Sequence, residues 1–128
     1  MGRRARIGLG LSVLTLVLAS GCRFTSAPAV VPANAAILRV TATPSGCPPI
    51  PSRVRAGPVE LVVTNLDAPA VDEVEIRTAN FARVLGEREN LVVGMTARVP
   101  MTLARGDYLV NCPGAARSHW SFQAVGTG

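Results

Sequence analysis

Few residues of this 128-residue chain carry side chains that could do chemistry. Thiol, imidazole and carboxylate groups are common metal ligands, nucleophiles and bases. Those of interest are Cys22, Cys47, Cys112, the single histidine His119, and the glutamate pairs Glu73/Glu75 and Glu87/Glu89. No Ser or Cys can be matched with a His and a carboxylate, and the chain has neither a phosphate-binding glycine loop nor the Cys-x-x-Cys spacing of thiol oxidoreductases. The sequence therefore predicts a protein that is not an enzyme.

The first cysteine follows a segment typical of an export signal. Residues 1–6 are basic, residues 7–18 are apolar, and small residues lead to Cys22. About a dozen apolar residues are too few for a spanning helix, which needs roughly 20. The sequence LASGC at 18–22 resembles the lipobox of bacterial lipoproteins, although its usual leucine stands one position further out. We therefore expect a signal peptide over residues 1–21 and a lipid on Cys22 that anchors the protein to the cell membrane, outside the cytoplasm.

The remaining composition indicates one small domain behind a tether. Residues 22–36 are rich in Ala, Pro and Ser and show no strand or helix period, so we expect a flexible linker there. With 48% hydrophobic and 16% charged residues, the chain is not a disordered charged tail. Once the three arginines of the signal are removed, ten Arg remain against eight acids, a net charge of +2. The few aromatic residues do not interleave with Arg, and we expect no nucleic-acid partner.

Residues 37–126 are predicted to form an all-β domain. Short runs rich in Val, Ile, Leu and Thr recur between Pro, Gly, Asn and Asp, a spacing typical of a β-sandwich or barrel. We expect about seven strands, near residues 37–43, 53–55, 59–65, 71–78, 83–87, 96–103 and 107–112, and a last one near 118–125. Because side chains alternate along a strand, Val74 and Ile76 should face the core, while Glu73, Glu75 and Arg77 should face solvent.

The order of several motifs resembles the EfeO-type cupredoxin-like domain. The motifs are SGCP at 45–48, GPVELVVTN at 57–65, EVE at 73–75, GERENL at 86–91, GDY at 106–108 and CPG at 112–114, and the resemblance covers about residues 36–126. It implies a Greek-key cupredoxin-like β-sandwich. It also implies a role in bacterial iron uptake, where such domains precede a helical domain with a His-x-x-Glu motif. A single histidine rules that motif out here, so a transport role would need a separate partner protein.

The resemblance does not imply a blue copper centre. Such a centre uses two His, one Cys and a weak axial Met. Cys112 has the expected setting at the end of a strand, but Asp72 and Glu73 lie where electron-transfer relatives place their first His, and no Met follows Cys112. His119 is better explained as a solvated strand residue than as a ligand. We therefore expect no type 1 copper.

The resemblance instead implies an iron or copper site drawn from Cys47, Cys112 and the glutamates, with Glu73, Glu75 and Glu89 as its main carboxylates. Two explanations compete for the cysteines. In an oxidising compartment two cysteines left after lipidation most often form a disulfide, and a disulfide would exclude both as thiolate ligands. The glutamates could equally be solvated or weakly paired charges.

Two functions therefore remain open. The first is a lipid-anchored metal-binding module linked to metal uptake and to an iron-uptake partner. The second is a structural or protein-interaction domain at the cell surface that carries no metal.

Overall fold

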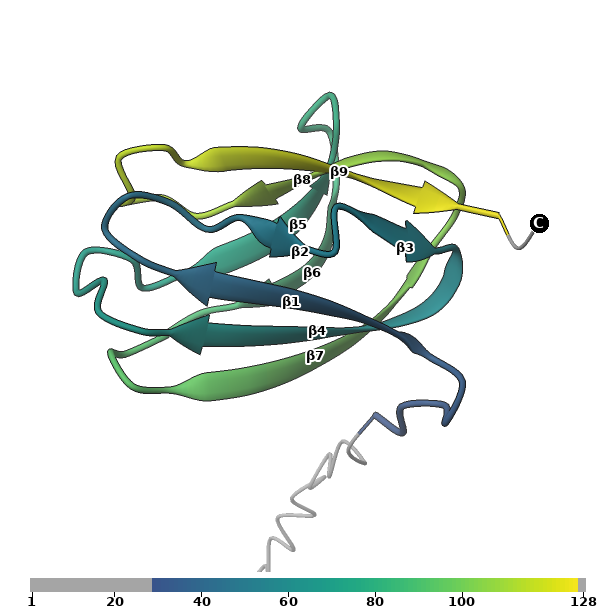
Figure 1. Ribbon diagram of the computed structural model, residues 1–128, viewed down its shortest axis with the longest axis horizontal. Coiled ribbons are helices and arrows are strands. Elements are labelled where there is room, and N and C mark those ends of the chain that lie inside the picture. Colours follow the sequence, from purple (N-terminus) through teal and green to yellow (C-terminus); the bar gives the residue numbers. More distant parts are fainter. Residues whose placement is uncertain (1–28, 127–128) are drawn as a thin grey trace, which may run out of the picture.

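The computed structural model describes residues 29–126, which form two β-sheets packed face to face (Figure 1). The described part of the chain contains strands and no helix, which confirms the predicted all-β sandwich. The strands are β1 Ala36–Ala42, β2 Pro49–Ile50, β3 Arg53–Arg55, β4 Gly57–Asn65, β5 Val74–Thr78, β6 Val84–Arg88, β7 Thr96–Leu103, β8 Gly106–Asn111 and β9 His119–Val125. Within residues 29–126, no helix is long and apolar enough to cross a membrane. The expected signal peptide and Cys22 lie outside the described residues.

The strand order explains how distant segments come together. One sheet has the order β2-β1-β4-β7 and the other β3-β9-β8-β5-β6. Strand β1 runs parallel to β4, and β4 runs antiparallel to β7. In the second sheet, β5 lies between β6 and β8 and is antiparallel to both. The chain changes sheet at five of its eight connections, so that the two sheets fold together as one unit.

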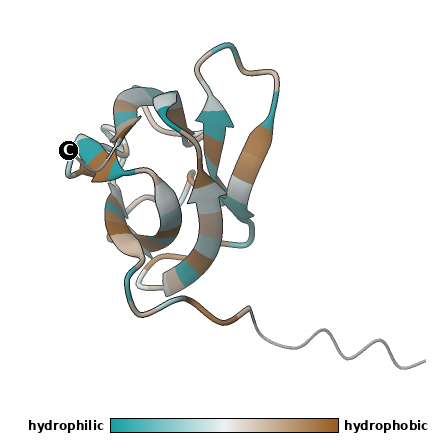
Figure 2. Cartoon of the chain, turned by 90° about the vertical axis from the view of Figure 1, so that its right-hand side faces the viewer, coloured by the Kyte–Doolittle hydropathy of each residue, from teal (hydrophilic) through white to brown (hydrophobic). Residues whose placement is uncertain are grey.

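Inward-facing residues from both sheets form the core. Leu38, Leu61, Ile76 and Val110 are fully buried, each on a different strand. Apolar and polar residues alternate along most strands, as the colour bands in Figure 2 show. Every buried residue of the core lies between positions 38 and 124, and the strands of both sheets all belong to the described residues. The segment 29–126 is thus a self-contained folding unit.

The two ends of the sandwich carry different parts of the chain (Figure 1). The loop end carries the connections β1–β2, β4–β5, β6–β7 and β8–β9, that is, residues 43–48, 66–73, 89–95 and 112–118. The tether end is the opposite one, where residues 29–35 enter β1. There the guanidinium of Arg55 donates a hydrogen bond to the carbonyl oxygen of Asn34. Residues 29–35 therefore enter the domain at the end remote from the four connections.

Most strand positions match the sequence prediction, and two points differ. The two-residue strand β2 was missed because Pro49 lies within it and Pro48 and Pro51 flank it, and prolines argue against a strand. The prediction that Glu75 faces solvent is wrong. Its side chain does lie on the outer face of the sheet, but it is 5% exposed. Side chains from its own strand and from β8 cover it there, as described below.

Candidate metal site

Three carboxylates meet beside the loop end, on the outer face of the β5–β6 ribbon. The antiparallel register places Glu75 opposite Glu87 and Val74 opposite Arg88. Side chains alternate along a strand, so the glutamates at 73, 87 and 89 share the outer face with Glu75. One carboxylate oxygen from each of Glu73, Glu87 and Glu89 lies within 4.8 Å of the other two. This acidic trio is the only group of at least three potential metal-binding side chains found within the described residues.

A shallow hollow adjoins the trio. It is lined by Asp72, Glu73, Glu89 and Asn90, which come from the β4–β5 and β6–β7 connections. Burial raises the pKa of the Glu73 carboxyl, and the negative charges around it raise that pKa further; these belong to Glu75, Glu89, Glu87 and Asp72. The hollow is thus a place of negative potential in which a proton or a cation is favoured.

Glu75 is not part of the trio, which corrects the prediction that it is a main ligand. Arg77 Nε donates to one carboxylate oxygen of Glu75 at 2.7 Å, and Arg77 Nη2 donates to the other at 2.9 Å. The amide of Asn111 on β8 donates to Glu75 at 2.6 Å. These bonds, led by those from Arg77, hold the pKa of Glu75 below its ordinary value. Glu75 is turned away from β6 toward β8, and Glu87 completes the trio in its place.

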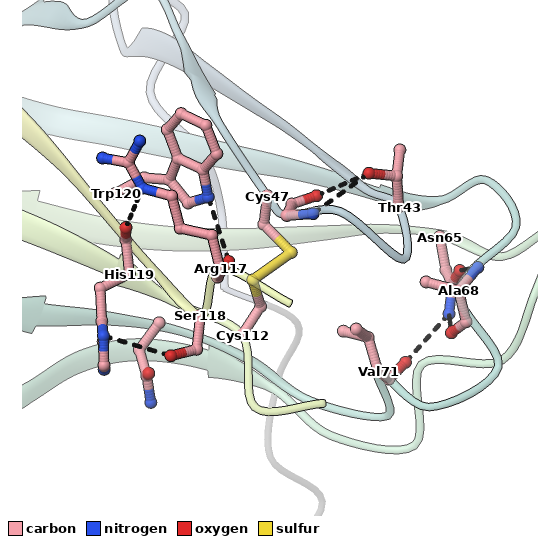
Figure 3. The surroundings of a disulfide bond; sticks show 12 residues. Thr43, Cys47, Asn65, Ala68, Val71, Cys112, Arg117, Ser118, His119 and Trp120 are labelled. Carbon is pink, nitrogen blue, oxygen red and sulfur yellow. Dashed lines mark hydrogen bonds between the residues drawn. A yellow bond between two sulfur atoms is a disulfide. The ribbon is translucent and has the colours of Figure 1, made fainter. Parts of the chain in front are cut away.

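The two downstream cysteines are joined in a disulfide, Cys47–Cys112, with Cα atoms 6.4 Å apart (Figure 3). Both residues are completely buried. The bond links the β1–β2 connection to the end of β8, the two segments that the topology brings together at the loop end. The disulfide expected for these two cysteines is thereby confirmed. Because both sulfurs are in the disulfide, neither Cys47 nor Cys112 is available as a thiolate ligand, and this alternative from the sequence is corrected.

Tight packing surrounds the disulfide. Gly46, which precedes the bonded cysteine, lies directly under the ring of Trp120, and a Cβ atom there would come within 2.7 Å of the indole Nε1. The guanidinium carbon of Arg117 stacks at 3.9 Å from the centre of the same ring. Arg117 N also donates to Ser45 O at 3.0 Å. The β1–β2 and β8–β9 connections are thus joined by a covalent bond, by backbone hydrogen bonds and by the close approach of Gly46 to Trp120. Figure 3 shows the disulfide beside the Arg117–Trp120 pair.

The single histidine is exposed, as expected for a solvated strand residue. His119 begins β9, and its ring meets the edge of the Phe81 ring with centroids 4.8 Å apart. Its Nδ1 lies 3.2 Å from the Ser118 hydroxyl. His119 is not a member of the acidic trio.

Asn65 is an organising residue that the sequence placed only at the end of a predicted strand. Its side chain is fully buried at the end of β4. The amide donates to the carbonyl oxygens of Ala68, Val71 and Leu91 at 3.0, 3.0 and 2.9 Å, and the side-chain oxygen accepts from the Ala68 N–H at 2.9 Å. One buried side chain therefore fixes both loops that line the hollow. The backbone also links the same two loops, because Leu91 N donates to Asp72 O at 2.8 Å.

The chain was compared with known proteins. No protein-family model matches it, and no curated protein sequence matches it either. The resemblance to the EfeO-type domain therefore stays a prediction from the motifs.

Proposed function

We propose that this protein is a lipid-anchored, extracytoplasmic cupredoxin-like module that binds iron or copper and serves metal uptake. The observation that carries the proposal is the convergence of Glu73, Glu87 and Glu89, with carboxylate oxygens within 4.8 Å of one another. Three like charges at such distances repel one another, and a cation between them removes the repulsion. The raised pKa of Glu73 reports the same unfavourable field.

The ligand chemistry narrows the choice of ion. Carboxylate oxygens favour hard or borderline ions such as iron or Cu(II) over Cu(I), which prefers sulfur. The disulfide removes the only two thiols of the described residues. The trio is half-buried to exposed, so water would complete the coordination shell and binding would be of moderate strength. No type 1 copper, with its intense blue colour, is expected at such a site.

The position of the trio suits a tethered module. The attachment through Cys22 and the linker is proposed from the sequence, and the linker would join the folded unit at its tether end. The hollow next to the trio is lined by two connections of the loop end, away from that attachment (Figure 1). A bound ion would thus be accessible to an iron-uptake partner that approaches from the side away from the membrane.

Calorimetric titration of the 29–126 segment with Cu(II), and with ferrous iron without oxygen, tests the proposal. We expect one ion per chain, and affinity reduced about tenfold or more in Glu73→Gln and Glu89→Gln, because each removes one of three charged ligands. Asp107→Asn is the matched control, since Asp107 is an exposed carboxylate on β8 outside the trio. Its affinity should equal that of the unmodified segment. Failure to bind either ion stoichiometrically, or equal loss in all three variants, would leave the metal-free interaction domain as the better explanation.

A further inference from the structure

An exposed apolar patch lies at the loop end, beside the acidic hollow. Nine large apolar side chains are exposed in the described part of the chain, and three of them lie on two neighbouring connections. Leu66, Val92 and Val93 are 59%, 62% and 50% exposed. We call these three residues the apolar tip. Single exposed apolar residues are ordinary, but a group of them on one rigid surface indicates a binding site.

The backbone holds the apolar tip in place. Gly94 N donates to Asn65 O at 2.7 Å, and Asn65 N donates to Met95 O at 2.9 Å, which pairs the start of one connection with the end of the other. Leu66 N donates to Ala42 O at 3.0 Å. These bonds and the buried Asn65 side chain fix the loops before any partner arrives. A preformed surface loses little conformational entropy on binding, which favours affinity.

Acidic residues lie on the same two connections as the apolar tip, or directly next to them. Six of the eight acidic residues of the chain lie between positions 67 and 89. Glu75 is bonded to Arg77 and Asn111, and the other five form the acidic border at the loop end: Asp67, Asp72, Glu73, Glu87 and Glu89. Two arginines of the described residues lie at the loop end or next to it: Arg117 is stacked on Trp120, and Arg88 Nη2 donates to Met95 Sδ at 3.6 Å. A complementary surface would be apolar at its centre and basic at its border. Anionic lipid would be repelled, and so would the same end of a second copy of this chain.

We propose that the apolar tip and its acidic border form the docking surface for a protein partner whose contact face is apolar and bordered by Lys or Arg. The surface lies opposite the tether end, so docking leaves the attachment free. The proposal goes beyond metal binding, because it concerns the side chains of Leu66, Val92 and Val93 and requires no ion.

The test uses the 29–126 segment with a chelator present, so that its outcome is independent of the metal site. The probe is a synthetic amphipathic peptide of Lys and Leu, compared with a peptide of equal length and charge in which Ser replaces Leu. We expect NMR shifts concentrated on residues 65–68 and 90–95, and about tenfold tighter binding of the Leu peptide. Leu66→Ser/Val93→Ser should remove that advantage. Ile50→Ser, which changes an equally exposed residue on β2, should retain it.

Other outcomes would overturn the proposal. Equal binding of the two peptides would mean that charge alone acts, and shifts spread over both sheets would mean that no surface is preferred. Association of the segment with phosphatidylcholine vesicles through the apolar tip would identify a lipid occupant instead. Sedimentation showing self-association that Leu66→Ser/Val93→Ser abolishes would identify a second copy of the chain.

Discussion

The side-chain amide of Asn65 donates a hydrogen bond of 2.9 Å to the carbonyl oxygen of Leu91, 26 residues further along the chain. This bond joins the end of β4, where the β4–β5 connection starts, to the β6–β7 connection. Both connections line the acidic hollow, and both carry residues of the apolar tip. The two surfaces to which we assign functions therefore depend on the same buried side chain.

Replacing Asn65 with Ala should destabilise the domain by about 3 kcal/mol, because several buried backbone groups lose their hydrogen-bond partner together. Urea unfolding of the 29–126 segment measures the change. Asn80→Ala is the control. The side-chain oxygen of Asn80 also accepts hydrogen bonds, from the Thr78 hydroxyl and from Ala82 N. Because Asn80 lies on the exposed β5–β6 turn, its replacement should lower the free energy of unfolding by less than about 1 kcal/mol. Equal costs for the two variants would contradict the organising role of Asn65.

Removing the disulfide should lower stability strongly without changing metal affinity. Cys47 and Cys112 are separated by 65 positions, and closing a loop of that length stabilises a fold by about 4 kcal/mol in the chain-entropy description. The double variant Cys47→Ala/Cys112→Ala should show this loss of stability on urea unfolding. The unmodified chain with its disulfide reduced should show a similar loss. In calorimetry below the unfolding range the variant should bind Cu(II) as before. A large loss of Cu(II) affinity in a variant that is still folded would contradict this prediction and indicate that the cysteines contribute to metal binding.

The sequence predicts the strands well because their pattern is local. Alternating residues and breakers place β3 and β7 at the bounds found, and the other long strands within a few residues. The inward positions of Val74 and Ile76 on β5 also follow from alternation, and both residues are fully buried. Each of these predictions uses only neighbours along the chain.

The candidate site was predicted less well, because it depends on which side chains meet across strands. Alternation places Glu73 and Glu75 on one face of the strand. It does not predict that Glu75 contacts Asn111, 36 positions away. That contact and the pairing with Arg77 decide that Glu87, rather than Glu75, joins the trio. Likewise nothing local distinguishes Asn65 from an ordinary residue at the end of a strand, since two of its four hydrogen bonds, those to Val71 and Leu91, are set by how the loops fold back.

Gly46→Ala should disturb the packing beneath Trp120. The added methyl would lie 2.7 Å from the indole Nε1, so the ring must shift, and we expect a cost of about 1 to 3 kcal/mol. Trp120 is the only tryptophan of the chain, and its fluorescence reports the shift directly. Gly94→Ala is a useful contrast, because a Cβ there meets no atom within 4 Å but the backbone has a φ of 85°. That variant should lose stability without altering the emission.

The ionised Glu75 carboxylate should stabilise the domain at neutral pH more than in acid. Its pKa is lowered in the folded state, chiefly by the hydrogen bonds from Arg77, so its contribution is fully present above the unfolded pKa of about 4.3. The contribution is lost as the pH falls through the lower, folded pKa. Glu75→Gln should thus be less stable than the unmodified segment at neutral pH, and the gap should narrow in acid. A gap that is constant with pH would contradict the ion pair.

Glu73, two residues earlier on the same face, should act in the opposite sense. Burial and the neighbouring carboxylates raise its pKa in the folded state, so ionising it costs more there than in the unfolded chain. Its favourable contribution is present below the unfolded pKa and is lost as the pH rises through the folded pKa. Without metal, Glu73→Gln should therefore be more stable than the unmodified segment at neutral pH, and equally stable well below about pH 4. Urea unfolding across that range, with a chelator present, measures both limits. A Glu73→Gln variant that is less stable at neutral pH would show that the carboxylate is satisfied by partners within the fold, and would remove the electrostatic support for a cation there.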